Sequence, residues 1–446
     1  MANDSKQRYI ITAAQYNAQV HDNFLTSLKQ YAKYNDAKIL VLPINDAGAN
    51  TEELAEELSN LELVEKETRL NSNFQIGQFN IPPQNVYPLQ GLYRFVQGDV
   101  STVVASPKSH LEVIANSNIK LPKVLMTTGA VTRPKYRKDR KGTIAEKDHR
   151  YGALIVEICD KNNYHFRQIE AVPTTGHFID FGLKYTGDAR PQKATLEALV
   201  LGDWHVGDTD PLVREATFDM IRTLEPKRIL LHDYFNGHSV NHHNDKKASV
   251  RSAEYDKNRS SLRKEIEACA KELQEFRKIA GPHTELVIVA SNHNEFLDRY
   301  LDDPNRFGND PINIEFACEL FPHYKREENP LEVALHKVSK IPETVRFLKR
   351  DEDYKVQGWQ LGSHGDQGSN GGRGSMSSKE AAYGKSITGH THAPKKLRDT
   401  IVVGTSTHLK LGYNKGPSSW MNSHALLYDN GKVEMVNVID GQWRME

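Results

Sequence analysis

Between residues 196 and 440, short apolar segments alternate with polar residues of the kind that bind metals. The segments LEALVLGD, RILLHD, ELVIVASNHN, KVQGWQLGSHGD and KSITGHTH each have the apolar composition of a buried strand and end in aspartate, asparagine or histidine. In α/β sheets, ligands gather at the carboxyl ends of the strands. This pattern therefore constrains the second half of the chain to an α/β fold that brings several polar motifs to one edge of a sheet.

Five short motifs carry the metal-binding residues of this region. Asp203 and His205 alternate along the chain, so both are expected on one face of an extended segment, and the same holds for His390 and His392. Carboxylate, imidazole and amide ligands together suit two divalent first-row metals. One such motif occurs often by chance, but five in this order, four of them directly after an apolar strand, indicate a site. In chain order they are Asp203-Trp-His205, Asp233, Asn292-His293, His364 and His390-Thr-His392.

With these motifs the chain resembles the calcineurin-like metallophosphoesterases, whose pattern is D-x-H, G-D, G-N-H-[DE], H and G-H-x-H. The resemblance covers about residues 196–440 and is most specific at GHTH, residues 389–392. Two departures stand out. His232 takes the place of the family's glycine before the aspartate, and the third motif reads Ser-Asn-His-Asn at 291–294. Neither departure removes a ligand, so both concern the turns and the groups around the ligands.

The resemblance implies a complete site and a reaction. Asp233 would bridge two divalent ions, expected to be manganese, with magnesium, iron or zinc as alternatives. A water or hydroxide held by the metals would attack phosphorus, and His293 would stabilise the developing charge or protonate the leaving oxygen. The remaining ligands would be Asp203, His205 and His392 for one ion, and Asn292, His364 and His390 for the other.

The resemblance also implies an architecture for the second half of the chain. We expect an α/β protein in which residues 196–446 form a two-sheet metallophosphoesterase sandwich flanked by helices, with a helical insertion around 301–350. Residues 1–190 are predicted to form a separate N-terminal α/β domain of unknown role. Further predicted elements are a strand–helix–strand over 8–43, a charged helix over 50–68, a hairpin around 161–163, a linker at 184–193 and a long helix over 253–280.

The composition excludes several classes of protein. Lys plus Arg and Asp plus Glu both number 58, so the chain is not a wholly basic nucleic-acid coat, although a local basic patch is compatible with that balance. No apolar run approaches the roughly 20 residues of a membrane span. Three cysteines are too few for a disulfide framework. We therefore expect a cytoplasmic protein without membrane contact.

Three features favour DNA as the substrate. Residues 133–150 carry eight Lys or Arg against three acids, with Tyr136 interleaved, a composition that suits a phosphate backbone. The flexible loop at 368–378 follows His364 and carries Arg373, and an N-terminal domain exceeds what a small substrate needs. Within the resemblance, the Mre11/SbcD-like nuclease branch is therefore favoured, and its dimers make a homo-oligomer an expectation. The predicted DNA contacts are Arg133, Lys135, Arg137, Lys138, Arg140, Lys141 and Arg373.

Several alternatives stay open. The protein would be a phosphatase or a nucleotide phosphodiesterase if its substrates are small, and a non-catalytic scaffold if the site has lost its metals, although every ligand position is filled. Exonuclease and endonuclease action are both compatible with the motifs. The N-terminal half begins like a nitrilase, but Ile44 and Asn45 occupy the place of the catalytic glutamate, so Cys159 is interpreted as a packed residue.

Overall fold

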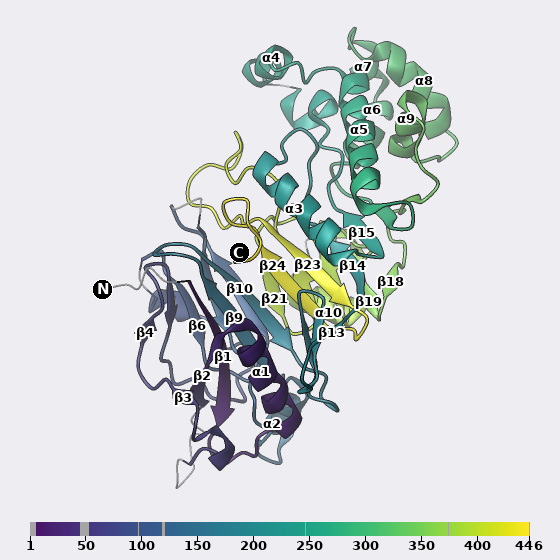
Figure 1. The fold of residues 1–446 in the computed structure, drawn as a ribbon. Helices are drawn as coiled ribbons and strands as arrows, with labels where there is room; N and C mark the ends of the chain where they lie inside the picture. The colour runs from purple at the N-terminus through teal and green to yellow at the C-terminus, as the bar shows by residue number, and fades with distance from the viewer. Residues whose placement is uncertain are drawn as a thin grey trace.

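The computed structural model of the protein describes residues 6–44, 53–96, 98–117, 121–245, 247–372 and 374–445. It is a mixed α/β fold, as predicted. Figure 1 shows the N-terminal half in purple and blue at one end and a group of helices at the other. The yellow C-terminal strands lie between them, so the last part of the chain occupies the middle of the molecule.

The N-terminal half is built around a five-stranded sheet with the order β10-β9-β1-β2-β3. The predicted strand–helix–strand is confirmed, because β1 (Gln7–Gln15) and β2 (Ala37–Ile44) pair in parallel across α1 (Asp22–Asn35). The predicted hairpin is confirmed as β9 (Gly152–Ile158) and β10 (Tyr164–Glu170).

The predicted charged helix over 50–68 is wrong in its described part. Residues 50–52 lie outside the described residues, and the rest forms the 3-10 turn η1 (Glu56–Leu58), the edge strand β3 (Glu62–Leu63) and the start of β4 (Thr68–Arg69). Leu58 and Val64 are the buried apolar residues between 53 and 68. A helix here would have too narrow an apolar face to be stabilised by packing.

Two further sheets face each other in the middle of the molecule. The first has the order β17-β16-β15-β14-β23-β24. The second has ten strands in the order β18-β19-β20-β22-β21-β7-β8-β6-β5-β4. Val200, Leu230 and Val287 of the first sheet belong to one buried cluster with Ile387 and Ile401 of the second, so the two sheets share a core. The strands of the first sheet are β14 (Leu196–Val200), β15 (Arg228–Leu231), β16 (Glu285–Ile288), β17 (Val345–Phe347), β23 (Ser423–Tyr428) and β24 (Val433–Asn437). Those of the second, besides β4, are β5 (Phe74–Ile76), β6 (Ser101–Val104), β7 (His110–Ile114), β8 (Lys123–Thr127), β18 (Lys355–Val356), β19 (Trp359–Gln360), β20 (Ser386–Thr388), β21 (Lys395–Leu397) and β22 (Thr400–Val402).

The ten-stranded sheet joins the two halves of the chain. Strand β21 pairs with β7 in an antiparallel register that sets Lys395 opposite Glu112 and Leu397 opposite His110. The backbone groups of each strand would otherwise be exposed at a sheet edge. The first 190 residues form the five-stranded sheet alone, but they share the ten-stranded sheet with the second half, so the predicted boundary near residue 190 does not separate two independent sheets. The predicted linker contains β12 (Leu183–Tyr185) and β13 (Gln192–Lys193), which pair beside β11 (Phe178–Asp180).

Helices cover the outer face of the six-stranded sheet (Figure 1). Helix α3 (Pro211–Leu224) begins after its cap Asp210, whose carboxylate accepts from Leu212 N. The predicted helical insertion is confirmed, although it begins earlier, at residue 295, and ends at 338. It consists of α6 (Glu295–Leu301), α7 (Pro304–Gly308), α8 (Ile314–Tyr324) and α9 (Pro330–Val338). None of the described helices is long and apolar enough to cross a membrane.

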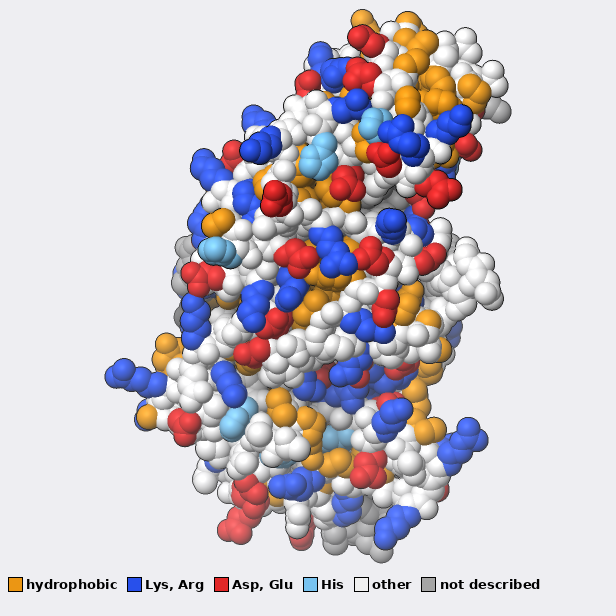
Figure 2. Space-filling model, turned by 90° about the vertical axis from the view of Figure 1, so that its right-hand side faces the viewer, with side chains coloured by type: hydrophobic (Ala, Val, Ile, Leu, Met, Phe, Trp, Pro, Cys, Tyr) orange, Lys and Arg blue, Asp and Glu red, His pale blue; other side chains and the backbone are white. Residues whose placement is uncertain are grey.

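The predicted long helix over 253–280 is two helices. Helix α4 (Ala248–Asp256) ends before Asn258, which has a left-handed φ of 59°, and α5 (Leu262–Ala280) begins after its cap Ser261. The apolar stripe of α5 is buried as predicted, whereas α4 buries no residue. The remaining helices are α2 (Arg140–Lys147) and α10 (Met376–Tyr383). The face in Figure 2 shows acidic and basic side chains interspersed along its length, which agrees with the balanced charge.

A buried ion cluster connects the N-terminal sheet to the C-terminal strands. The guanidinium of Arg167, on β10, contacts Asp180 and lies 3.1 Å from Glu157 Oε2 and 3.2 Å from Glu434 Oε1, the last on β24. Burial raises the pKa of Glu157, but the guanidinium of Arg167 outweighs burial and lowers that pKa to about 2. The phenol of Tyr428 donates to Glu434 Oε2 at 2.7 Å. One cation thus satisfies carboxylates from both ends of the chain.

Replacing Arg167 with alanine is expected to destabilise the protein by roughly 3–5 kcal/mol, because buried carboxylates then lose their partner. Calorimetric unfolding measures the change. Arg326→Ala is the matched control, since Arg326 pairs with Glu328 at the surface and its loss is expected to cost less than about 1 kcal/mol. Equal effects of the two substitutions would contradict a structural role for the cluster.

Candidate metal centre

The five predicted motifs converge at the carboxyl ends of strands. Asp203 and His205 follow β14, Asp233 follows β15, and Asn292 and His293 follow β16. His364 comes after β19, and His390 and His392 come after β20. The first three strands belong to the six-stranded sheet and the last two to the ten-stranded sheet. The motifs therefore meet where the carboxyl ends of the two facing sheets come together.

The side chains form two groups that share one carboxylate. The first group is Asp203, His205, Asp233 and His392, and the second is Asp233, His364 and His390. Within each group the potential ligand atoms lie within 4.8 Å of one another. This is the division expected from the sequence, with Asp233 in the bridging place. Asn292 is half-buried, and its side-chain oxygen has no hydrogen-bond partner among the described residues.

The donor atoms fit divalent cations. His205 Nε2 and His392 Nε2 lie 3.1 Å apart, and His392 Nε2 lies 3.1 Å from Asp203 Oδ2. Two bonds of about 2.1 Å at a right angle would separate two ligand nitrogens by about 3 Å. In the described part of the chain, buried Asp203 Oδ1 and Asp233 Oδ1 have no hydrogen-bond partner. Unpartnered buried carboxylate oxygens are costly, so the arrangement is one that a cation would complete.

The protonation preferences of the ligands agree with metal binding. Burial, followed by the neighbouring His293, lowers the pKa of His205 to about 3, so its imidazole is neutral at neutral pH. The neutral imidazole is the form that ligates a metal. The pKa of Asp233 is held well below its usual range, because His364 and other nearby imidazoles outweigh the effect of burial. Burial also lowers the pKa of His390, whereas the carboxylates of Asp233 and Asp203 outweigh burial and raise the pKa of His364 to about 9. The imidazole of His364 therefore carries a proton that a bound cation would displace.

Four of the seven predicted ligands have left-handed backbone conformations. The φ angles are 47° for His205, 44° for Asp233, 80° for His390 and 57° for His392. This corrects the expectation that Asp203 and His205, or the two histidines of GHTH, share a face by alternating along an extended strand. Positive φ is uncommon for residues other than glycine and is found where function demands it. The turns, rather than strand alternation, aim these side chains.

Gly389 allows two of the motifs to approach each other. A Cβ atom at this position would lie 2.1 Å from Asp203 Oδ1, which is closer than any side chain could tolerate. The next residue, His390, donates its backbone N–H to Asp203 Oδ2 at 2.8 Å. The glycine of GHTH is therefore required for the close contact between the last motif and the first.

His293 lies beside the first group of ligands and has a defined tautomer. Its ring centroid is 4.6 Å from that of His205. Its Nδ1 lies 2.7 Å from the carbonyl oxygen of Asn236, and because a carbonyl only accepts, Nδ1 carries the hydrogen. Nε2 has no hydrogen-bond partner among the described residues. This nitrogen is therefore available to exchange a proton with a substrate.

Of the groups that surround the ligands, the sequence indicated Asp366, which follows His364 by two residues, and missed the others. His232, which departs from the family pattern, is fully buried, and its Nδ1 lies 3.3 Å from Nδ1 of His364. Asp366 accepts from the guanidinium of Arg350 at 2.8 Å. Lys379 is buried and donates to Thr388 Oγ1, at the end of β20. Only the occurrence of His232 at a position normally occupied by glycine could have revealed one of them.

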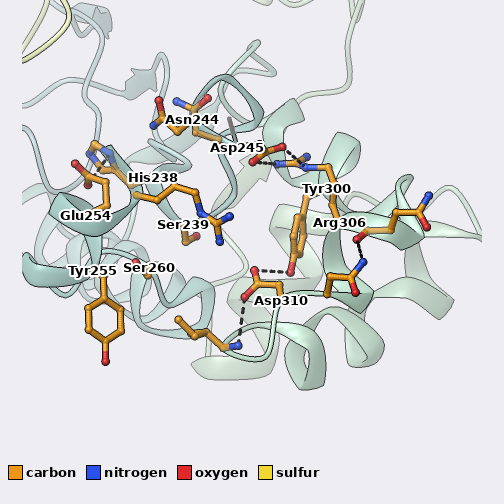
Figure 3. Close-up of a pocket in the computed structure, with 15 residues that line it drawn as sticks. His238, Ser239, Asn244, Asp245, Glu254, Tyr255, Ser260, Tyr300, Arg306 and Asp310 are labelled. Carbon is orange, nitrogen blue, oxygen red and sulfur yellow. Dashed lines mark hydrogen bonds and ion pairs between the residues drawn. The ribbon is translucent and has the colours of Figure 1, made fainter. Parts of the chain in front are cut away.

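A polar pocket of about 340 Å³ adjoins the centre without containing any of the seven ligands. Figure 3 shows its lining, with His238 and Glu254 on one side and Tyr300, Arg306 and Asp310 on the other. His238 Nε2 lies 2.9 Å from Asp208 Oδ2. Asn236 donates to the same oxygen at 2.8 Å, and its carbonyl holds His293. The pocket is thus connected to His293 through two residues.

The structure does not bring the basic segment 133–150 to the metal centre. Arg150 pairs with Asp399 and Asp148 with Arg398, both at the turn before β22. The metal ligands lie beyond the opposite end of that strand. Extended chain of about five residues, β22 and the residues that follow it, spans roughly 15 Å between that turn and the ligands. Figure 1 places α2 at the lower end of the molecule. All six predicted cations of this segment are exposed, and Arg373 lies outside the described residues.

The N-terminal half shows no sign of nitrilase chemistry at its cysteine. Cys159 is partly buried, its sulfur faces the carbonyl of Glu157, and burial raises its pKa to about 11. A thiol of this kind is not a nucleophile.

Comparison with known proteins gives one relative. The chain is similar to Protein A1 of Escherichia phage T5, with 28% identity over an alignment of 473 residues. The alignment covers 98% of this chain and 83% of that protein. No protein-family model and no solved structure matches the chain. The similarity thus includes both halves, and the chemistry has to be inferred from the residues themselves.

The shared position of Asp233 predicts a graded loss of metal. Elemental analysis after dialysis is expected to find about two divalent ions per wild-type chain, about one in His364→Ala and fewer than one in Asp233→Ala, because only Asp233 belongs to both groups. Asp353→Ala, which removes an exposed carboxylate paired with Lys355, is the control and should retain both ions. Equal losses in the two ligand variants would contradict a bridging role for Asp233.

Proposed function

We propose that this protein is a two-metal phosphoesterase that hydrolyses phosphodiester bonds, with DNA as its substrate. The observation that carries the proposal is the pair of ligand groups joined by Asp233, in which buried carboxylate oxygens have no hydrogen-bond partner in the described part of the chain. Two metals about 3.5–4 Å apart are the common solution for phosphate ester hydrolysis. A resemblance to the calcineurin-like metallophosphoesterases and, within them, to the nuclease branch supports the same reaction.

Bound as a pair, divalent ions would lower the pKa of water and neutralise charge on the phosphate. The chain's own contribution is to hold the ligand side chains in place and to supply a proton. His293 is oriented by the Asn236 carbonyl, which leaves Nε2 to donate to the leaving oxygen. Gly389 and the left-handed turns keep the ligands close enough to share Asp233. Burial of Asp203 and Asp233 excludes bulk water from the charged groups.

A polymeric substrate is supported by cations near the centre rather than by the segment 133–150. Lys410 and Lys415 are exposed on the segment between β22 and β23, which ends at Trp420, in contact with the ring of His392. In the described part of the chain neither lysine has an ion-pair partner. Free cations beside a phosphate-cleaving centre suit a backbone that extends past the cleaved bond.

A small phosphoester is the second candidate, and one observation favours it. The basic segment on which a DNA contact was predicted lies at the other end of β22 from the ligands. A phosphatase or nucleotide phosphodiesterase would have no use for that segment. The predicted contacts of residues 133–141 with DNA remain a prediction, which the salt dependence of DNA binding would test.

Hydrolysis in the presence of manganese should separate these candidates. Purified protein is incubated with linear and circular DNA and with a chromogenic diester and monoester, with manganese, magnesium or EDTA. We expect DNA and the diester to be cleaved with manganese, and EDTA or Asp233→Ala to abolish both reactions. Cleavage of the small esters alone would favour the second candidate, and no hydrolysis of any ester would reject the phosphoesterase proposal.

His293→Ala should separate the proton donor from the metal ligands. We expect kcat for DNA to fall by roughly 10²–10⁴, the usual contribution of a general acid, while the metal content stays at the wild-type level. His323→Ala, which removes an exposed histidine paired with Glu328, is the control for the loss of an imidazole. Loss of metal in His293→Ala would instead place this histidine among the ligands.

A further inference from the structure

Three aromatic rings form a continuous series from a metal ligand to the protein surface. The ring centroid of Trp420 is 4.2 Å from that of His392, and that of Tyr413 is 5.7 Å from Trp420. Both contacts are edge-on. Tyr413 remains 62% exposed although its neighbours belong to the centre. Single exposed aromatic residues are common, but this one is connected through a second ring to a predicted metal ligand.

Tyr413 lies within electrostatic reach of the centre. Burial around its hydroxyl group, followed by the carboxylates of Asp208, Asp233 and Asp203, raises the pKa of this phenol. Two of these carboxylates belong to the predicted metal ligands. The phenol of Tyr413 therefore lies within the electric field of these carboxylates, while the side chain as a whole is largely exposed.

The segment that carries the two rings is held in place from both sides. Asn414 accepts from Leu411 N at 2.7 Å and donates to Leu409 O at 2.9 Å, which closes the turn that precedes Lys415. Ser418 and Asn116 exchange backbone hydrogen bonds of 2.9 and 3.1 Å. Directly after Trp420, Met421 donates its N–H to the carbonyl of His392. Residues fixed in this way present a preorganised surface.

The bonds to Asn116 give the N-terminal half a part in this surface. Asn116 follows β7, which joins the ten-stranded sheet through its pairing with β21. The side chain of Asn116 donates to Leu121 O at 3.4 Å, so the residue is fixed within its own half. The first half of the chain therefore positions a segment that touches a metal ligand of the second half.

We propose that Tyr413, supported by Trp420, is the stacking platform for an unpaired nucleobase next to the scissile phosphate, so that the substrate strand is single-stranded where it is cut. The proposal rests on the function proposed above and names the part of the substrate that the centre recognises. Stacking on an aromatic ring accepts every base, because each base has a π face. Lys410 and Lys415, exposed on the same segment, would contact the phosphates on either side.

This platform distinguishes nucleic acid from the other phosphoesters. A phosphoprotein or an aliphatic phosphate has no flat ring to stack, and a base within a duplex is already stacked on its neighbours. A strand end, a flap or an unwound segment offers a free base. We therefore expect affinity to depend on a base being present and unpaired, and to depend little on which base it is.

Binding measured in EDTA tests the platform without any hydrolysis. Fluorescence anisotropy compares a labelled single-stranded oligonucleotide with the same strand made of abasic sites, on wild type, Tyr413→Ala, Tyr413→Phe and the control Tyr34→Ala. Tyr34 is an exposed tyrosine on α1. Wild type should bind the base-bearing strand roughly tenfold more tightly than the abasic one, in line with the contribution of one stacked base. Tyr413→Ala should lose that preference, and Tyr413→Phe and Tyr34→Ala should retain it.

Equal binding of the two strands by the wild-type protein, or the same preference in Tyr413→Ala, would overturn the platform. A Tyr413→Phe variant that behaves like Tyr413→Ala would mean that the hydroxyl group, not the ring, makes the contact. Circular dichroism of each variant confirms that the chain is folded.

Steady-state hydrolysis in manganese separates this inference from the proposed function. For Tyr413→Ala we expect KM for single-stranded DNA to rise roughly tenfold, and the chromogenic diester to be affected less than DNA. Absence of all hydrolysis in wild type, together with base-dependent binding in EDTA, would reject the phosphoesterase and retain the platform. Normal hydrolysis with equal effects on both substrates would reject the platform and retain the phosphoesterase.

Discussion

Two fully buried carboxylates, Asp203 and Asp233, impose the strongest demand on this fold. Each has an oxygen atom without a hydrogen-bond partner among the residues that the structure describes, and imidazoles lie close to both. Buried anions of this kind persist only where cations or donors compensate their desolvation. The facing sheets, the left-handed turns and Gly389 all bring ligand atoms to these two carboxylates. The ordered core of the second half thus serves to hold one charged centre.

The first half of the chain contributes none of the predicted metal ligands, but it contacts the elements that carry them. It supplies half of the ten-stranded sheet, and through Arg167 it shares a buried ion cluster with β24. Through Asn116 it also fixes the segment that ends at Trp420. Similarity to the phage protein over 98% of the chain agrees with a single unit in which both halves are required.

Sequence patterns predicted most of the residues that come together in the two groups able to hold metal ions, but few of the residues around them. Asp233 and the histidines of GHTH could be found because each motif combines a metal-binding residue with a preceding apolar strand. His232, Arg350 and Lys379 could not, because their partners come from distant parts of the chain. The alternation argument named the right pair in Asp203 and His205 for the wrong reason, since His205 has a left-handed backbone. A left-handed backbone conformation at a residue other than glycine can rarely be predicted from the sequence.

The local pattern of apolar and polar residues was enough to predict the α/β class, the order of the five motifs and the set of residues able to bind metal. These properties follow from apolar periodicity and residue chemistry, which act over a few residues. The pairing of β21 with β7, the approach of Tyr413 to the centre and the remote place of residues 133–150 depend on contacts between segments hundreds of residues apart. Such contacts are selected by the total burial and backbone pairing of the folded chain, and no short segment contains that information.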